Sequence, residues 1–105
     1  MSESLNLTNA TLKTVLTDAM VVRAHVTDLN EAPAGISQVN GSSVLNLPPG
    51  AYKYGIVETA ITSNFATQKD IPHTIQSNGY GFYTRISYNN NWQPWVGYVG
   101  VKLSS

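Results

Sequence analysis

The stretch Tyr80-Gly81-Phe82-Tyr83-Thr84-Arg85-Ile86-Ser87-Tyr88 decides the fold. Every second position carries an aromatic or β-branched side chain, and this period of two is typical of a β-strand. The Asn89-Asn90-Asn91 run that follows predicts a turn. Beyond it, the alternation of Trp95, Val99, Val101 and Leu103 predicts a last strand over residues 95–103.

The chain upstream repeats this pattern of short strands and turns. Alternation predicts strands over residues 20–26 and 51–61 and a short one over 73–76, whereas residues 63–72 are expected to form a polar loop. Residues 36–47 predict one or two strands broken at Asn40-Gly41, a dipeptide typical of hairpin turns. We therefore expect a mainly β fold, a small antiparallel β-sandwich or knob.

The N-terminal part has a different period. Over residues 9–20, apolar side chains recur at the spacing of one helical face, at Leu12, Val15, Leu16 and Ala19. This stripe predicts a short helix, and the alternative is an extended, Thr-rich stalk in which neighbouring chains wind together. We accordingly divide the chain into a stalk or trimerisation segment, residues 1–27, and a β-rich knob domain, residues 28–105.

Composition limits the partners. Charged residues make up 11% of the 105 residues and the formal net charge is zero, so the chain lacks the basic surface that binds nucleic acid. No stretch approaches the ~18 apolar residues of a membrane span. The chain has no Cys, so it cannot form disulfides. Because packing alone stabilises a domain of this size only marginally, we expect subunits to share a core, as a homotrimer.

The titratable residues do not form a motif for catalysis or metal binding. The six acidic residues are scattered, and Asp70-x-x-His73, which could orient a general base, lacks a nucleophile motif. His25 and His73 are far apart in the sequence, so His residues meeting around a three-fold axis are the remaining possibility for a metal site. We expect no enzyme activity, no metal and no cofactor.

Binding is the better interpretation of the composition. The chain carries six Tyr, two Trp and two Phe, with ten each of Asn, Ser and Thr. Aromatic rings can stack on the C–H faces of sugars, and neutral side chains can hydrogen-bond to the hydroxyl groups. The alternative is that the aromatic side chains fill the core or a subunit interface.

Residues 79–95, Gly-Tyr-Gly-Phe-Tyr-Thr-Arg-Ile-Ser-Tyr-Asn-Asn-Asn-Trp-Gln-Pro-Trp, carry a family resemblance. An aromatic–x–Arg strand followed by a turn and Trp–x–x–Trp resembles the closing motif of pyocin-knob and bacteriophage tail-fibre tip domains. Asp28-Leu29-Asn30 resembles the opening turn of that family, Asn46-Leu47-Pro48 its Asn–x–Pro element, and Thr67-Gln68 a Thr/Gln-containing strand. The resemblance covers residues 27–100 and has no counterpart for the first 26.

The resemblance implies a homotrimeric knob at the distal end of a phage tail fibre or tailspike. Such a domain, located in the virion and joined to the rest of the fibre or spike, would bind a bacterial surface glycan without cleaving it. The low charge favours a neutral polysaccharide. A mildly acidic sugar is the alternative, because residues 71–105 carry Arg85 and Lys102 but no acidic residue. The alternative is a structural module that only trimerises the end of the fibre and assists its folding.

The resemblance also suggests roles for side chains. Arg85 is expected to stack on Trp92 or Trp95. Because Pro94 cannot donate a ladder hydrogen bond, we place Trp92 at the turn with its ring partly exposed, and Trp95 in the core on the face of Val99, Val101 and Leu103. The expected glycan-binding residues are Trp92, Asn90, Asn91, Gln93, Tyr83 and Arg85.

Overall fold

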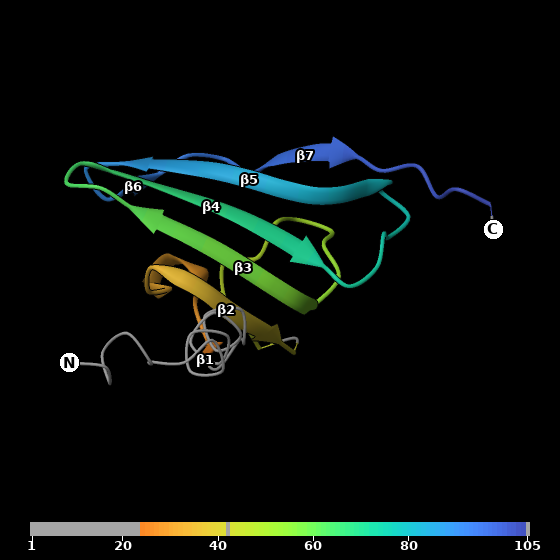
Figure 1. Cartoon of the computed structure of the whole chain (residues 1–105), viewed down its shortest axis with the longest axis horizontal. Coiled ribbons are helices and arrows are strands. Elements are labelled where there is room, and N and C mark those ends of the chain that lie inside the picture. The colour runs from red at the N-terminus through yellow and green to blue at the C-terminus, as the bar shows by residue number, and fades with distance from the viewer. Residues whose placement is uncertain (1–23, 42, 105) are drawn as a thin grey trace, which may run out of the picture.

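The computed structural model describes residues 24–41 and 43–104, and in this part of the chain seven strands form one curled sheet (Figure 1). The strands and the single short 3-10 helix found there are β1 (Ala24–Val26), η1 (Leu29–Glu31), β2 (Gly35–Asn40), β3 (Tyr54–Ile61), β4 (Phe65–Pro72), β5 (Tyr80–Tyr88), β6 (Asn91–Trp92) and β7 (Val96–Val99). The helix or stalk expected over residues 9–20 lies outside the described residues. Over the described ranges, no helix is long and apolar enough to cross a membrane.

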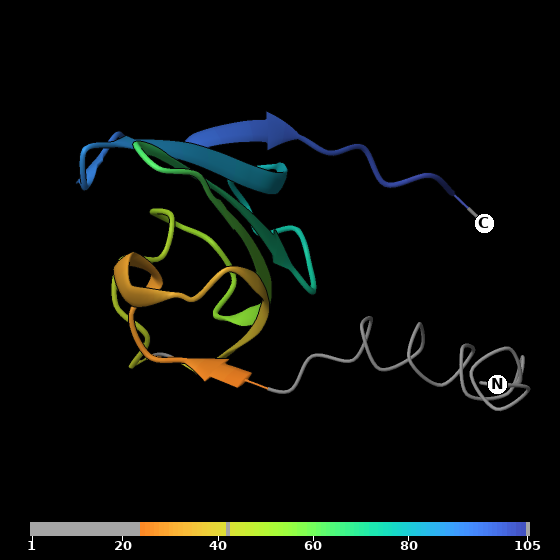
Figure 2. The same cartoon turned by 60° about the vertical axis from the view of Figure 1, so that its left-hand side comes forward.

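The sheet is mixed rather than wholly antiparallel as predicted. Its order is β1-β2-β3-β4-β5, and both β6 and β7 lie along the far edge of β5. β1 pairs parallel with β2, because the connection through η1 returns the chain in the same direction, and the other pairs are antiparallel. In the described part of the chain no second sheet faces this one, and the connecting segments 27–34 and 43–53 lie inside the curl (Figure 2).

Some predicted strands are confirmed and others are wrong. The strand Tyr80–Tyr88 is confirmed, β2 ends at Asn40, and β3 lies within residues 51–61. The polar loop expected over residues 63–72 is strand β4, because its polar side chains at Gln68 and Asp70 point into the protein. Residues 73–76 lie outside any strand, and the last strand covers only Val96–Val99.

The inner face of the sheet buries many polar side chains, whereas the outer face exposes apolar ones. The inner face, which packs against the connecting segments, buries Val39, Val57 and Tyr83 together with six polar or charged side chains: Ser37, Thr59, Gln68, Asp70, Arg85 and Ser87. The outer face carries apolar side chains in solvent, with Ile86 51% and Val96 52% exposed. The aromatic and β-branched positions that identify β5 as a strand therefore lie mainly on its exposed face.

The hydrophobic core is small. It consists of Val26, Leu29, Ala32, Val39, Val44 and Val57, with Leu47 and Trp95 packed against it. Trp95 contacts the core as predicted, but Val99, Val101 and Leu103 do not, since they are 76%, 77% and 88% exposed. The predicted core role of these three residues is therefore wrong. Val99 is the last residue of the edge strand β7, and Val101 and Leu103 follow where the chain has left the sheet.

Asp70 is buried, and no described residue compensates its charge. The side chain is 1% exposed, and its Oδ2 atom finds no hydrogen-bond partner within residues 24–41 and 43–104. Asp70 lies between Val57 and Tyr83 in the strand register. Burial raises the pKa of this carboxyl from 3.8 to about 7, because the ionised form loses its hydration.

We predict that Asp70→Asn stabilises the protein at neutral pH. Because the folded-state pKa lies above the unfolded one, the wild type loses stability as pH rises from about 4 to about 7 and stays less stable above that. At roughly 1.4 kcal/mol for each pH unit, the loss is on the order of 4 kcal/mol. Asn has nearly the shape of the neutral acid and does not ionise, so the variant should lose this part of the pH dependence.

Urea unfolding at pH 4.5 and pH 7.5 measures the difference between variant and wild type. Glu31→Gln, at an exposed carboxylate in η1, serves as the control and should change little. Equal pH dependence in the wild type and in Asp70→Asn would show that Asp70 ionises normally in the fold.

Candidate functional site

The site begins with an irregularity at the edge of β5. Ser87 pairs with Trp92 and Thr84 with Val96, so three residues, 93–95, lie opposite two on β5. In a regular strand, residues three apart point to opposite faces. The extra residue, at a place where Pro94 cannot donate a ladder bond, lets both Trp92 and Trp95 lie on the inner face.

Arg85 lies between these two indole rings. Its guanidinium carbon is 4.1 Å from the centroid of Trp92 and 4.4 Å from that of Trp95. The predicted stacking is confirmed and involves both rings rather than one. A desolvated cation–π contact contributes up to about 2 kcal/mol, so two of them offset much of the cost of burying the charge.

Neutral amides bind the edges of the same guanidinium. Arg85 Nε donates to Gln68 Oε1 and Nη2 donates to Asn30 Oδ1, both at 2.8 Å. Gln68 in turn donates through Nε2 to the carbonyl of Leu29 at 2.5 Å and to Thr59 Oγ1 at 3.3 Å. Burial lowers the pKa of Arg85 to about 10, so the group remains a cation at neutral pH.

The turn at residues 28–30 closes this network. Asp28 Oδ1 accepts from the backbone N–H of Asn30 at 2.9 Å and from Asn46 Nδ2 at 2.7 Å. These bonds, led by the one from Asn46, lower the pKa of the Asp28 carboxyl below its ordinary value. Trp95 Nε1 donates to the Asn46 carbonyl at 3.1 Å. Arg85, Asn30, Asp28, Asn46 and Trp95 are therefore linked in one connected network.

Two hollows flank Trp92. The first, the Trp95 hollow, has a volume of about 530 Å³ and is lined by Asn30, Asn46, Leu47, Pro49, Arg85, Trp92, Gln93, Pro94 and Trp95. The second, the Asn90 hollow, has a volume of about 330 Å³ and is lined by Asn30, Glu31, Ala32, Thr59, Ile61, Ala66, Ser87, Asn90 and Trp92. Trp92 and Asn30 belong to both, so they separate two adjoining depressions.

The structure brings four of the six predicted site residues together. Trp92, Gln93 and Arg85 line the Trp95 hollow, and Asn90 lines the Asn90 hollow. Asn91 is exposed in β6 but lines neither hollow.

Tyr83 does not belong to the site. It is 3% exposed on the inner face, and its hydroxyl accepts from Asn78 Nδ2 at 2.7 Å. The prediction that Tyr83 contacts a glycan is therefore not supported, because its side chain is buried and lines neither hollow.

Asn30, Asn46 and Gln68 are parts of the site that the sequence did not reveal. Each belongs to a motif that resembles the knob family, but no role followed from the motif alone. Their contacts join residues 17 to 55 positions apart in the chain, as the bonds Arg85–Gln68 and Arg85–Asn30 show. Residues 66–70, Ala-Thr-Gln-Lys-Asp, show no alternation of apolar and polar side chains, so the sequence carries no strand signal that points to Gln68.

The described residues contain no group of three or more side chains suited to hold a metal ion. Asp70 and His73 do not form a pair that could act as a base, since Asp70 is buried and His73 is exposed. Comparisons of the chain with protein-family models, with curated proteins and with solved structures found no match. The case for a function therefore depends on the geometry of the two hollows.

We predict that Arg85→Lys destabilises the fold although it keeps the charge. A lysine ammonium cannot stack as a plane between two rings or donate in two fixed directions, so Gln68 and Asn30 lose their partner. Disrupting a buried network of this kind costs about 3 kcal/mol or more. Denaturant unfolding followed by tryptophan fluorescence measures the loss. Lys53→Arg, on an exposed side chain, is the matched control, and equal stability of Arg85→Lys and wild type would refute a scaffold role for Arg85.

Proposed function

We propose that this chain is the distal receptor-binding domain of a phage tail fibre or tailspike and that it binds a bacterial surface polysaccharide without cleaving it. The observation that carries the proposal is the position of Trp92. Its ring is only partly buried, stacks on Arg85 and lines two hollows whose polar side chains include the amides of Asn30, Asn90 and Gln93. An indole ring surrounded by neutral donors and acceptors is suited to a sugar.

The charges around the hollows favour a neutral ligand. The positive charge of Arg85 is covered by the Trp92 and Trp95 rings and bound by two amides. Glu31 lines the Asn90 hollow and is exposed. A carboxylate at the rim repels an anionic polysaccharide, whereas the side-chain amides can form hydrogen bonds with the neutral hydroxyl groups of a sugar.

The carboxylates near the hollows support binding rather than hydrolysis. Glycoside hydrolysis generally requires two carboxyl groups on either side of the scissile bond, one of them protonated. Asp28 accepts two hydrogen bonds that lower its pKa, so it is a poor proton donor, and this leaves Glu31 alone. Our proposal therefore assigns no catalytic residue.

In this proposal the domain is a homotrimer in the phage virion, joined to the rest of the fibre or spike and acting at the host cell surface. Shallow hollows bind a sugar weakly, and three copies in each fibre increase the overall affinity by avidity. The alternative function, a trimerisation and folding module that contacts no cell, is favoured by the apolar outer face of the sheet. Adsorption to cells separates the two functions.

We predict that Asn90→Gly and Gln93→Ala weaken adsorption but leave the fold intact. Asn90 has φ 67°, which Gly adopts without strain, and the backbone N–H of Gln93 still donates to Ile86. Each variant removes an amide that can bind a hydroxyl group, a contact of about 1 kcal/mol, so single-site affinity should fall roughly fivefold. In a trimer, avidity should enlarge the loss.

The measurement is adsorption of the labelled chain to a panel of bacteria with and without their surface polysaccharide. Gln76→Ala, at an exposed amide that lines neither hollow, is the control and should adsorb like wild type. If the wild-type chain adsorbs to no strain, the structural alternative gains support. Adsorption that is insensitive to both variants would place the glycan elsewhere.

A further inference from the structure

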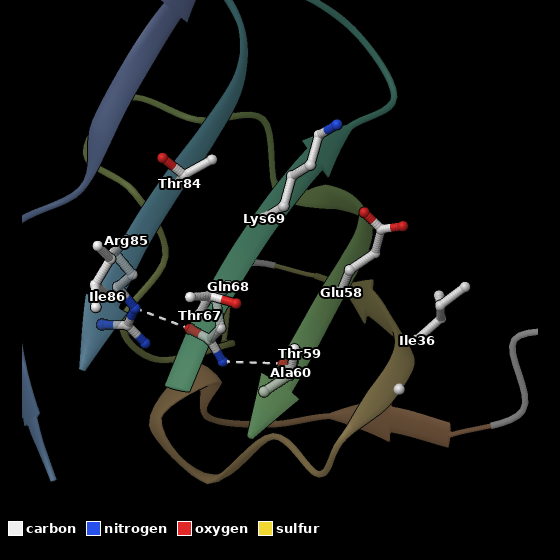
Figure 3. Close-up of a pocket in the computed structure, with 11 residues that line it drawn as sticks. Ile36, Glu58, Thr59, Ala60, Thr67, Gln68, Lys69, Thr84, Arg85 and Ile86 are labelled. Carbon is white, nitrogen blue, oxygen red and sulfur yellow. Dashed lines mark hydrogen bonds between the residues drawn. The ribbon is translucent and has the colours of Figure 1, made fainter. Parts of the chain in front are cut away.

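The outer face of the sheet contains a groove whose outward-pointing side chains are not part of the proposed glycan site. The lining residues that it shares with the two hollows, Thr59 and Arg85, belong to the inner face. The outer groove has a volume of about 560 Å³ and runs across four strands, with Ile36 on β2, Glu58 on β3, Lys69 on β4, and Thr84 and Ile86 on β5 (Figure 3). One polar pair beside it is satisfied within the chain, since the Thr84 and Tyr98 hydroxyls lie 3.0 Å apart in a hydrogen bond, whereas the carboxylate of Glu58 is exposed. An apolar groove of this kind on a sheet whose opposite face buries polar side chains indicates a surface that is covered.

The C-terminal tail is exposed to solvent along the residues that the structure describes. After β7 the chain runs away from the sheet (Figures 1 and 2), with Val101 77% and Leu103 88% exposed. Val99, Val101 and Leu103 alternate with Gly100, Lys102 and Ser104, so an extended tail presents one apolar side. We define this tail as residues 100–104.

The direction of β7 takes the tail away from its own groove. Val96 pairs with Thr84 in the groove, and Val99 already pairs with Tyr80 at the start of β5. Continuing this course, the tail leaves the sheet beyond Tyr80, on the side opposite to Ile86. To enter its own groove the tail would have to reverse its path, whereas a second copy of the chain can offer its tail directly.

We propose that the tail of one copy of this chain lies in the outer groove of another. Five extended residues span about 16 Å, and four neighbouring strands span about 14 Å, so the tail matches the width of the groove. The charges are also complementary. Lys69 Nζ lies 4.5 Å from the centroid of Phe82, toward β5, and the exposed carboxylate of Glu58 on β3 is the acidic group that Lys102 of the incoming tail can meet.

Tail exchange gives the proposed homotrimer a contact surface. It therefore rests on the homotrimer part of the proposed function. It does not depend on glycan binding, because the outer groove and the Trp92 hollows lie on opposite faces of the sheet. Failure of adsorption would therefore leave tail exchange untouched, and failure of tail exchange would leave adsorption untouched.

Disulfide trapping tests the contact directly, since the chain has no Cys of its own. Full-length chains carrying Leu103→Cys are co-refolded with differently tagged chains carrying Thr67→Cys or Thr84→Cys, two positions in the groove, and then oxidised. We expect a disulfide between the two kinds of chain with at least one groove position. Leu45→Cys, exposed but outside the groove, is the control partner and should not cross-link with Leu103→Cys.

The result that overturns the proposal is the absence of a cross-link at both groove positions, or cross-linking to the Leu45→Cys control with equal efficiency. In a chain carrying both Thr67→Cys and Leu103→Cys, a disulfide that forms only within one chain would also overturn it. If light scattering shows a trimer but no cross-link forms, the homotrimer is supported and tail exchange is refuted. A monomer would refute both the homotrimer and tail exchange.

Deletion of residues 101–105 provides the second measurement. The deleted residues lie outside every strand described, so β1 to β7 should remain folded. We expect light scattering to show the full chain as an oligomer and the truncated chain as a monomer with unchanged strand content. Leu45→Ser, which removes an exposed apolar side chain outside the groove, should remain oligomeric, and a truncated chain that keeps the oligomeric state would contradict the proposal.

Discussion

The rest of the structure depends on the packing of one guanidinium between two indole rings. Burying an ion costs several kcal/mol unless its charge and its hydrogen bonds are compensated. Arg85 obtains both, from Trp92 and Trp95 on its faces and from Gln68 and Asn30 at its edges. Six buried apolar residues form the core, so this cluster joins β4, β5, the β6–β7 loop and the turn at residues 28–30 where packing alone would hold them weakly.

The sequence predicts the strands better than it predicts their orientation. Alternation identifies β5 correctly, but it cannot say which face is buried when one carries Phe82 and Ile86 and the other carries Tyr83 and Arg85. The polar face is buried because Gln68 and Arg85 bond to each other, and Gln68 also bonds to the Leu29 carbonyl. Such compensation is invisible in a single strand, which is why residues 63–72 suggest a loop although they form β4.

The candidate site is predictable where its contacts are local. The Asn89–Asn90 turn follows from residue type, since both residues take a positive φ. Stacking of Arg85 on the rings follows from the resemblance to the knob family. The contributions of Asn30 and Asn46 do not follow from it, because the curl of the sheet must first bring the turn at residues 28–30 and Asn46 to the Arg85–Trp95 cluster. The exposure of Val101 and Leu103 escapes prediction for a similar reason. Alternation shows that the two side chains share one side of the chain, but it does not show what packs against that side.

Scaffold and site share residues, and this sharing has a physical consequence. One side of Trp92 packs on Arg85, so the ring is already held in place before any ligand arrives and little side-chain entropy remains to be lost on binding. The same arrangement limits how the site can change, because replacing Trp92 alters the cluster on which the fold depends. In the proposed function, variation in ligand preference is therefore most easily accommodated at Asn90 and Gln93, whose side chains line the hollows but contribute little to the core. Since the outer groove lies on the opposite face, assembly of copies can leave both hollows open to solvent.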